Sequence, residues 1–149
     1  MPAARTDPNP TALDQLAVDL RVSLLRTARR LRAQKSVDEL SDAQFSVLAH
    51  LFTQGPRTPG ELAEAEHVRP PSMTRTIAGL VEQGLVTRTD HPDDGRQVLI
   101  SVTDRGREVV EETRARRAAW LSRRLESLTE AERATLAEAA RILRTVISE

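Results

Sequence analysis

The residues of this chain that first suggest chemistry are two neighbouring carboxylates, Asp93 and Asp94, in the segment HPDDGRQVLIS at residues 91–101. Adjacent carboxylates can bind a cation or take part in acid–base catalysis. A calcium loop, however, needs oxygen ligands at alternating positions and a closing glutamate about twelve residues along. The alternating positions after Asp93 do not supply that series, since they hold Gly95, Gln97 and Leu99. The spacing therefore argues against a metal site and directs attention to Arg96.

No other arrangement of residues predicts catalysis or metal binding. The three histidines fall in three different predicted elements without ligand spacing: His50, His67 and His91. A Ser-His-Asp combination and a glycine-rich phosphate loop are both missing from the sequence. The paired carboxylates of a glycosidase need a cleft, and the tip of a hairpin is the wrong place for one. We therefore expect no enzyme activity, no cofactor and no metal site.

A second group of polar residues lies at the start of a predicted helix that follows Arg69. Its apolar stripe, which must face the core, consists of Met73, Ile77, Leu80 and Val81. The opposite face is short, hydroxylated and cationic near the N-terminus, where it carries Pro71, Ser72, Thr74, Arg75 and Thr76. Small residues allow close approach to a DNA groove, hydroxyls reach phosphates or base edges, and arginine can make two hydrogen bonds to guanine. This face therefore predicts contact with the major groove.

The elements that position these residues are marked by capping boxes, in which a hydroxyl is followed three residues later by Glu or Gln. The boxes are Ser41–Gln44, Thr58–Glu61 and Thr129–Glu132, and further caps are expected at Thr11 and Thr103. Apolar periodicity after these caps predicts six helices. Residues 85–89 and 97–102 are β-branched and predict a hairpin, with Asp94-Gly95 as the turn signal and Gly95 at positive φ. Four helices, a hairpin and two helices give a mainly α fold with the winged helix-turn-helix order.

The segment LAEAEHVRPPSMTRTIAGLVEQGLVTR, residues 62–88, resembles the MarR family of bacterial transcription regulators. The matching residues are Leu62, Ala63, Val68, Thr74, Arg75, Leu80, Gly84, Leu85, Val86 and Arg88. The following DDGR and SVTDRG resemble the wing and the start of the next helix, so the resemblance covers roughly residues 11–147. Two residues depart from it: Glu66 and His67 stand where the family usually has Leu and a small residue such as Gly. We expect this departure to weaken core packing at the turn.

The resemblance implies a winged helix-turn-helix repressor that binds double-stranded DNA, and it allows contacts to be assigned. Four residues would act in the major groove, Ser72, Thr74, Arg75 and Thr76, and Pro71 beside them is also assigned to DNA binding. Arg96 would enter the minor groove, where narrow A·T-rich DNA attracts arginine. Three more arginines would lie near phosphates: Arg57, Arg69 and Arg88. Asp94 would aim a guanidinium, that of Arg96, Arg75 or Arg88, through a charge-assisted bond.

The two ends of the chain predict a homodimer, because both carry apolar stripes on either side of the winged unit. These stripes are Leu13, Leu16, Leu20, Leu24, Ala28 and Leu31 on the first helix, and Leu136, Ala140, Leu143 and Ile147 on the last. We divide the chain into a disordered tail (1–10), an N-terminal dimerisation helix (11–40), a winged helix-turn-helix domain (41–102) and C-terminal dimerisation helices (103–149). The resemblance implies a two-fold dimer on a pseudo-palindromic operator, and a small aromatic or anionic effector.

The composition of the chain restricts which functions and locations are possible. The chain has 149 residues, no cysteine, and a formal net charge of zero from 22 basic and 22 acidic residues. Without cysteine there is no disulfide, zinc–thiolate site or thiol-based sensor. With no apolar run of membrane-spanning length, we expect a cytoplasmic protein without a membrane partner. The zero net charge supports an alternative, a winged-helix module that binds other proteins and not DNA; salt-dependent binding to duplex DNA would discriminate between the two.

Overall fold

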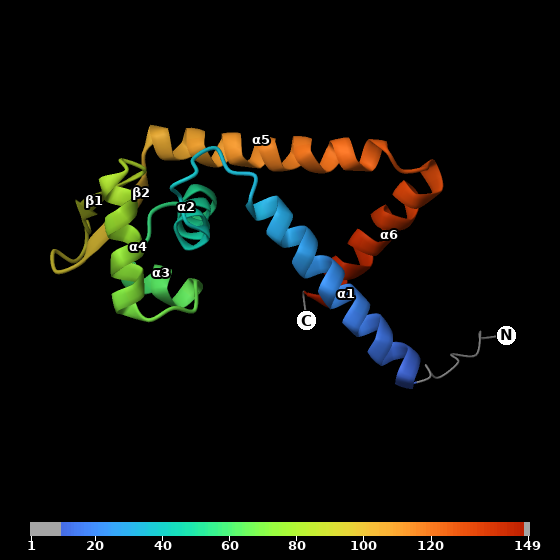
Figure 1. The fold of residues 1–149 in the computed structure, drawn as a ribbon. Coiled ribbons are helices and arrows are strands. Elements are labelled where there is room, and N and C mark those ends of the chain that lie inside the picture. The colour runs from blue at the N-terminus through green and yellow to red at the C-terminus, as the bar shows by residue number, and fades with distance from the viewer. Residues whose placement is uncertain (1–9, 148–149) are drawn as a thin grey trace. The chain divides into compact units, whose positions relative to one another are not determined.

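The computed structural model describes residues 10–147, and this range contains six helices and one two-stranded antiparallel sheet (Figure 1). The helices are α1 (Pro10–Arg32), α2 (Asp42–Gln54), α3 (Pro59–Ala65), α4 (Pro70–Glu82), α5 (Asp104–Glu126) and α6 (Glu130–Val146). The strands are β1 (Val86–Asp90) and β2 (Val98–Val102). This order confirms the predicted mainly α fold with one hairpin. The tail was predicted at residues 1–10; residues 1–9 lie outside the described residues, and Pro10 is the first residue of α1.

The chain divides into two units, one ending at Ala33 and the other starting at Gln34. Within the first unit, α1 begins at Pro10, whose missing N–H group is harmless in the first turn of a helix. The prediction that Thr11 caps this helix is therefore wrong, since Thr11 lies inside it. The large apolar side chains of α1 are mostly exposed, including Leu13, Leu16, Leu20, Leu24 and Leu25.

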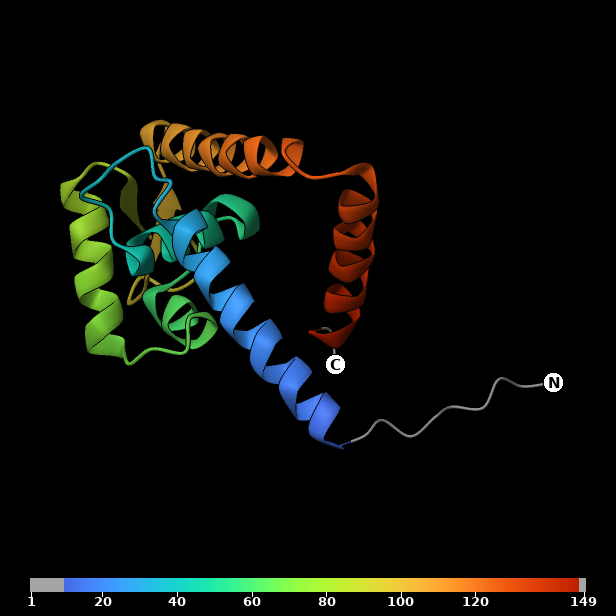
Figure 2. The same cartoon turned by 45° about the vertical axis from the view of Figure 1, so that its right-hand side comes forward.

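The hydrophobic core of the second unit is formed by α2, α3, α4, the hairpin and the first half of α5. Its fully buried apolar side chains are Leu40, Val47, Leu48, Leu51, Leu62, Met73, Ile77, Leu80, Leu85, Ile100 and Val110. Figure 2 shows these elements gathered at the start of α5. Val81 was predicted to share the buried stripe of α4, but it is 39% exposed. Met73, Ile77 and Leu80 already complete the i, i+4, i+7 face, and Val81 lies at its edge.

All three predicted capping boxes are confirmed. The hydroxyls of Ser41, Thr58 and Thr129 each accept a hydrogen bond from the backbone amide three residues on, and the side chain at that position accepts one in return. Thr103 caps α5 by accepting from the backbone amide of Gly106 at 3.1 Å. These local bonds satisfy backbone amides that no helical carbonyl can reach, so they fix where each helix begins.

The hairpin pairs Val86 with Val102 and Asp90 with Val98, one residue later at the start of each strand than predicted. Residues 91–97 connect the strands. Gly95 does not have the predicted positive φ, which among the described glycines belongs to Gly55 and Gly84. The connection is closed differently, because the backbone amide of Gln97 donates to the carbonyl of Asp94 at 2.9 Å.

Helix α5 is attached to the core by polar and aromatic contacts as well as apolar ones. The hydroxyl of Thr113 is fully buried and bonds to Ser36 Oγ at 3.0 Å. The guanidinium of Arg114 lies over the ring of Phe52, with 4.9 Å to the ring centre. Beyond Thr113, α5 has no buried side chain, and α6 has none at all. None of the helices in residues 10–147 is both long and apolar enough to span a membrane.

Candidate nucleic-acid interface

The exposed face of α4 carries the residues that were predicted to read DNA. Pro71, Ser72, Thr74 and Arg75 are exposed and Thr76 is half-buried, while the opposite face is held in the core. Arg69 is the residue before the helix, and its side chain makes no capping hydrogen bond. Its guanidinium is therefore not committed to the start of α4. The structure thus brings six of the predicted contact residues together at one end of one helix.

The hydroxyls of Thr74 and Thr76 are already used within α4. Thr74 Oγ1 donates to the carbonyl of Pro70 at 3.0 Å, and Thr76 Oγ1 donates to that of Ser72 at 3.1 Å. Each hydroxyl has one donor, so in this state the two threonines can offer only oxygen lone pairs and methyl groups to a partner. Acceptor oxygens suit the amino groups of adenine and cytosine, and methyl groups suit the methyl of thymine.

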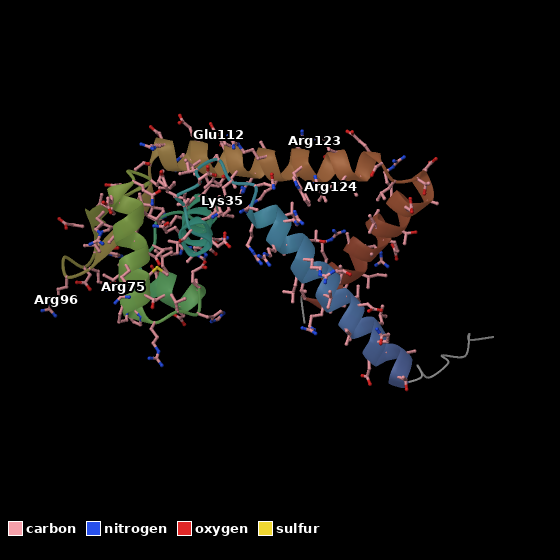
Figure 3. The ribbon with its side chains drawn as sticks, in the orientation of Figure 1. Lys35, Arg75, Arg96, Glu112, Arg123 and Arg124 are labelled. Atoms are coloured by element: carbon pink, nitrogen blue, oxygen red, sulfur yellow. The ribbon has the colours of Figure 1, made fainter. Side chains whose placement is uncertain are left out.

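The hairpin connection presents Arg96, which is exposed, with Asp94 half-buried behind it. Figure 3 shows Arg96 at the end of the hairpin and Arg75 on α4, both pointing away from the ribbon. One carboxylate oxygen of Asp94 accepts from the backbone amide of Arg96 at 3.1 Å, and the other accepts from Gln97 Nε2 at 2.9 Å. Both bonds lower the pKa of the Asp94 carboxyl, and the bond from Gln97 has the larger effect. In this state the hydrogen bonds of Asp94 are made within the turn itself, and its predicted role in aiming a guanidinium stays a prediction.

The other predicted phosphate contacts lie at the middle of the hairpin strands. The backbone of Arg57 pairs with Ile100 of β2, which pairs on its other side with Arg88 of β1. The two arginines therefore flank Ile100 across the sheet. Arg88 is exposed, but Arg57 is half-buried and its guanidinium donates to the carbonyl of Pro56 at 2.9 Å. Arg57 thus lies beside β2 with Arg88 and is not part of the exposed face of α4.

Comparison with known proteins agrees with this architecture. A sequence model of the MarR family matches residues 40–98. An HTH-type transcriptional regulator of Mycobacterium bovis is 44% identical over 135 residues, which cover 91% of this chain and 94% of that protein. The chain belongs to the MarR family. The HTH-type transcriptional repressor MdtR of Bacillus subtilis is 33% identical over 123 residues, covering 80% of this chain and 79% of MdtR.

Solved structures extend the agreement to the fold. The structure of ligand-free wild-type MarR from E. coli superposes with a TM-score of 0.73 at 28% identity, covering 86% of this chain and 95% of MarR. Membership of the MarR family makes this protein a DNA-binding transcriptional regulator with a winged helix-turn-helix. Both the resemblance read from residues 62–88 and the predicted fold class are confirmed.

One side-chain contact of this MarR family member, between Glu66 and α2, was not predicted from the sequence. Glu66, whose departure from the family pattern was expected to weaken packing, is half-buried, and its Oε2 accepts from Ser46 Oγ at 2.6 Å. His67 has a φ of 52°, the left-handed region that glycine adopts without strain. The unusual residue types were visible in the sequence, but the contact between Glu66 and α2 was not. Among residues 10–147, no three His, Asp or Glu side chains are grouped to hold a metal ion.

Proposed function

We propose that this protein is a homodimeric repressor that binds a pseudo-palindromic operator, with α4 in the major groove and Arg96 in the minor groove. The observation that carries the proposal is the exposed face of α4, where small side chains, hydroxyls and Arg75 stand opposite a fully buried stripe. A helix that enters a groove needs this division, because its reading face must be free of core contacts. Arg69 and Arg88 are exposed on either side of this helix in the sequence and are suited to phosphates.

The dimer is supported by the apolar residues that a single chain leaves uncovered. Helix α6 buries no side chain although Leu136, Ile142, Val146 and Ile147 lie on it or at its end. Helix α1 exposes a similar series. Large apolar patches of this kind mark interaction surfaces, and a second copy is the simplest partner that covers both helices by symmetry. We therefore assign residues 11–40 and 103–149 to dimerisation and residues 41–102 to DNA binding.

The repressor role rests on the name of one relative, the transcriptional repressor MdtR. A repressor must also be released, and we propose a small aromatic or anionic effector that changes the separation of the two α4 helices. Half-sites one helical turn apart can be occupied together only when that separation fits the DNA, so a small shift lowers affinity strongly.

The test is selection of duplexes from a random-sequence pool by the full-length protein, followed by sedimentation of the protein with and without the selected DNA. We expect a two-fold symmetric consensus, a protein dimer, and binding that weakens steeply as salt is added. A consensus without symmetry would contradict the dimeric arrangement. Failure to bind any duplex would overturn the proposal and favour a module that binds other proteins. A reporter placed behind the selected site should be silenced by the protein, and activation would contradict the repressor role.

A further inference from the structure

The turn between α3 and α4 is attached to α2 by a side chain as well as by the core. Ser46 and His50 lie four residues apart on α2 and therefore on one face of that helix. Glu66 reaches both of them: its Oε2 accepts from Ser46 Oγ at 2.6 Å, and its Oε1 lies 3.9 Å from His50 Nδ1. The side chains of His50 and Glu66 are 26% and 20% exposed, so this contact is partly withdrawn from water.

The backbone of this turn has little freedom on its α3 side. The amides of Glu66, His67 and Val68 donate to carbonyls of α3 at 3.0, 3.1 and 3.0 Å. Helix α4 begins at Pro70, four residues after Glu66. The Glu66 side chain consequently fixes α2 to the segment that leads into the DNA-reading end of α4.

We propose that Glu66 is a positioning residue for operator binding, and that its attraction to His50 makes the position of α4 depend on pH. This inference rests on the proposed role of α4 as the element that reads the operator. A histidine gains a positive charge as the pH falls from 8 to 5. The charged imidazole attracts the Glu66 carboxylate, holds the turn against α2 and favours the arrangement that binds DNA. The protein should therefore bind its operator more tightly at mildly acidic pH.

Other charged groups face the same groove and have to be separated from this effect. The groove is lined by α2, α3 and α5 and also contains Arg57, Glu61, Glu64 and Arg114. The carboxylate of Glu61 is held by Thr58, at 2.7 Å from its backbone amide. Arg114 donates to Thr53 Oγ1 at 3.2 Å. The arginines keep one charge between pH 5 and 8, and carboxylates ordinarily do the same, so replacing His50 separates the effect of the imidazole from that of these groups.

The experiment measures the dissociation constant of the full-length protein for a duplex selected by the wild type, from pH 5.5 to 8.0 at constant ionic strength. The wild type should tighten by about two- to fivefold toward pH 5.5, which is the size expected of a partly exposed ion pair. Glu66→Gln keeps an oxygen for Ser46 but has no charge, so it should bind like the wild type at pH 8 and lose the tightening. His50→Gln should also lose the tightening of operator binding toward pH 5.5. His67→Asn is the matched control, since asparagine tolerates positive φ, and it should keep the tightening.

Ser46→Ala should weaken binding at every pH, and Ser46→Thr should restore it, because the hydroxyl contact does not titrate. Amide hydrogen exchange at residues 66–69 gives a readout without DNA: it should slow toward pH 5.5, relative to the intrinsic rate, in the wild type and not in Glu66→Gln. If Glu66→Gln keeps the full pH profile of the wild type, the inference is wrong while the proposed function stands. If the wild type binds no duplex, the proposed function fails and this inference fails with it.

Discussion

Thr103 Oγ1 donates a hydrogen bond of 2.7 Å to the carbonyl of Gly84, which joins the first residue before α5 to the turn that ends α4. The backbone amide of Thr103 donates to the neighbouring carbonyl of Leu85 at 3.0 Å. A Cβ atom on Gly106 would overlap that same carbonyl oxygen, so glycine allows α5 to start directly against the turn. The helix assigned to dimerisation and the helix assigned to DNA reading therefore share one rigid junction.

Replacing Thr103 by valine should loosen this junction. The substitution keeps the side-chain volume but removes both the bond to Gly84 and the cap of α5, and we expect a loss of about 1–2 kcal/mol in the free energy of unfolding. Thr103→Ser keeps the hydroxyl and should stay within about 0.5 kcal/mol of the wild type. Chemical denaturation of the two variants tests this pair, and equal stabilities would contradict the role of the hydroxyl.

Arg75 and Arg69 should affect DNA binding in different ways. Arg75→Ala should cost about 1–3 kcal/mol of binding free energy on the selected site and relax its base preference, because an arginine at a base edge carries sequence information. Arg69→Ala should weaken binding to all sequences alike. It should also reduce the slope of the logarithm of affinity against the logarithm of salt concentration by about one. Arg123→Ala, on the exposed outer part of α5, removes the same charge from a residue outside the winged unit and should leave the base preference unchanged. Unaltered affinity and base preference in Arg75→Ala would show that its role is assigned wrongly.

Asp94 should matter for DNA binding through the backbone of the turn. Asp94→Asn has only one acceptor oxygen, so it loses either the bond from the Arg96 amide or the bond from Gln97. We expect this loss to weaken operator binding at pH 7. Asp93→Asn is the matched control. The pKa of Asp94 is lowered in the folded chain, so its contribution is complete above the unfolded value, about 4, and is lost as the pH falls through the folded one. Backbone exchange at Arg96 should therefore increase in acid beyond the intrinsic rate, and an identical acid response in Asp94→Asn would contradict this account.

His67 should be a site where a single substitution stabilises the protein. An L-residue at a φ of 52° is strained, and glycine relieves that strain at the cost of greater freedom in the unfolded chain. We expect His67→Gly to raise the free energy of unfolding by about 0.5–1 kcal/mol, and His67→Val to lower it, since branching at Cβ disfavours positive φ. Thermal and chemical unfolding give the comparison. A less stable glycine variant would mean that the imidazole makes a contribution larger than the strain.

Features determined by local chemistry could be read from the sequence. The boxes at Ser41, Thr58 and Thr129 were predictable because the capping partners lie three residues apart and need no tertiary contact. The stripe of Met73, Ile77 and Leu80 was predictable for the same reason, since helical periodicity fixes a common face.

Features that depend on contacts between elements could not be read in this way. Asp94-Gly95 predicted a tight turn with glycine at positive φ, but the side chains of Asp94 and Gln97 close a longer connection instead. Glu66 was interpreted as a defect in packing, because its hydroxyl partner lies twenty residues earlier on α2. Arg57 lies beside β2 because its backbone pairs with Ile100, a contact that no local pattern encodes.

Helix α6 has 17 residues and no buried side chain, so nothing within its own unit gives it the packing on which helices of this length depend. The stability of α6 should therefore depend on the concentration of the protein and not only on contacts within one chain. If a second copy covers α6 as proposed, dilution separates the copies and exposes this helix to unfolding and proteolysis, whereas a high concentration protects it. We expect the half-life of the regulator to lengthen with its own abundance, so a cell that halves the synthesis of this protein should lose more than half of it.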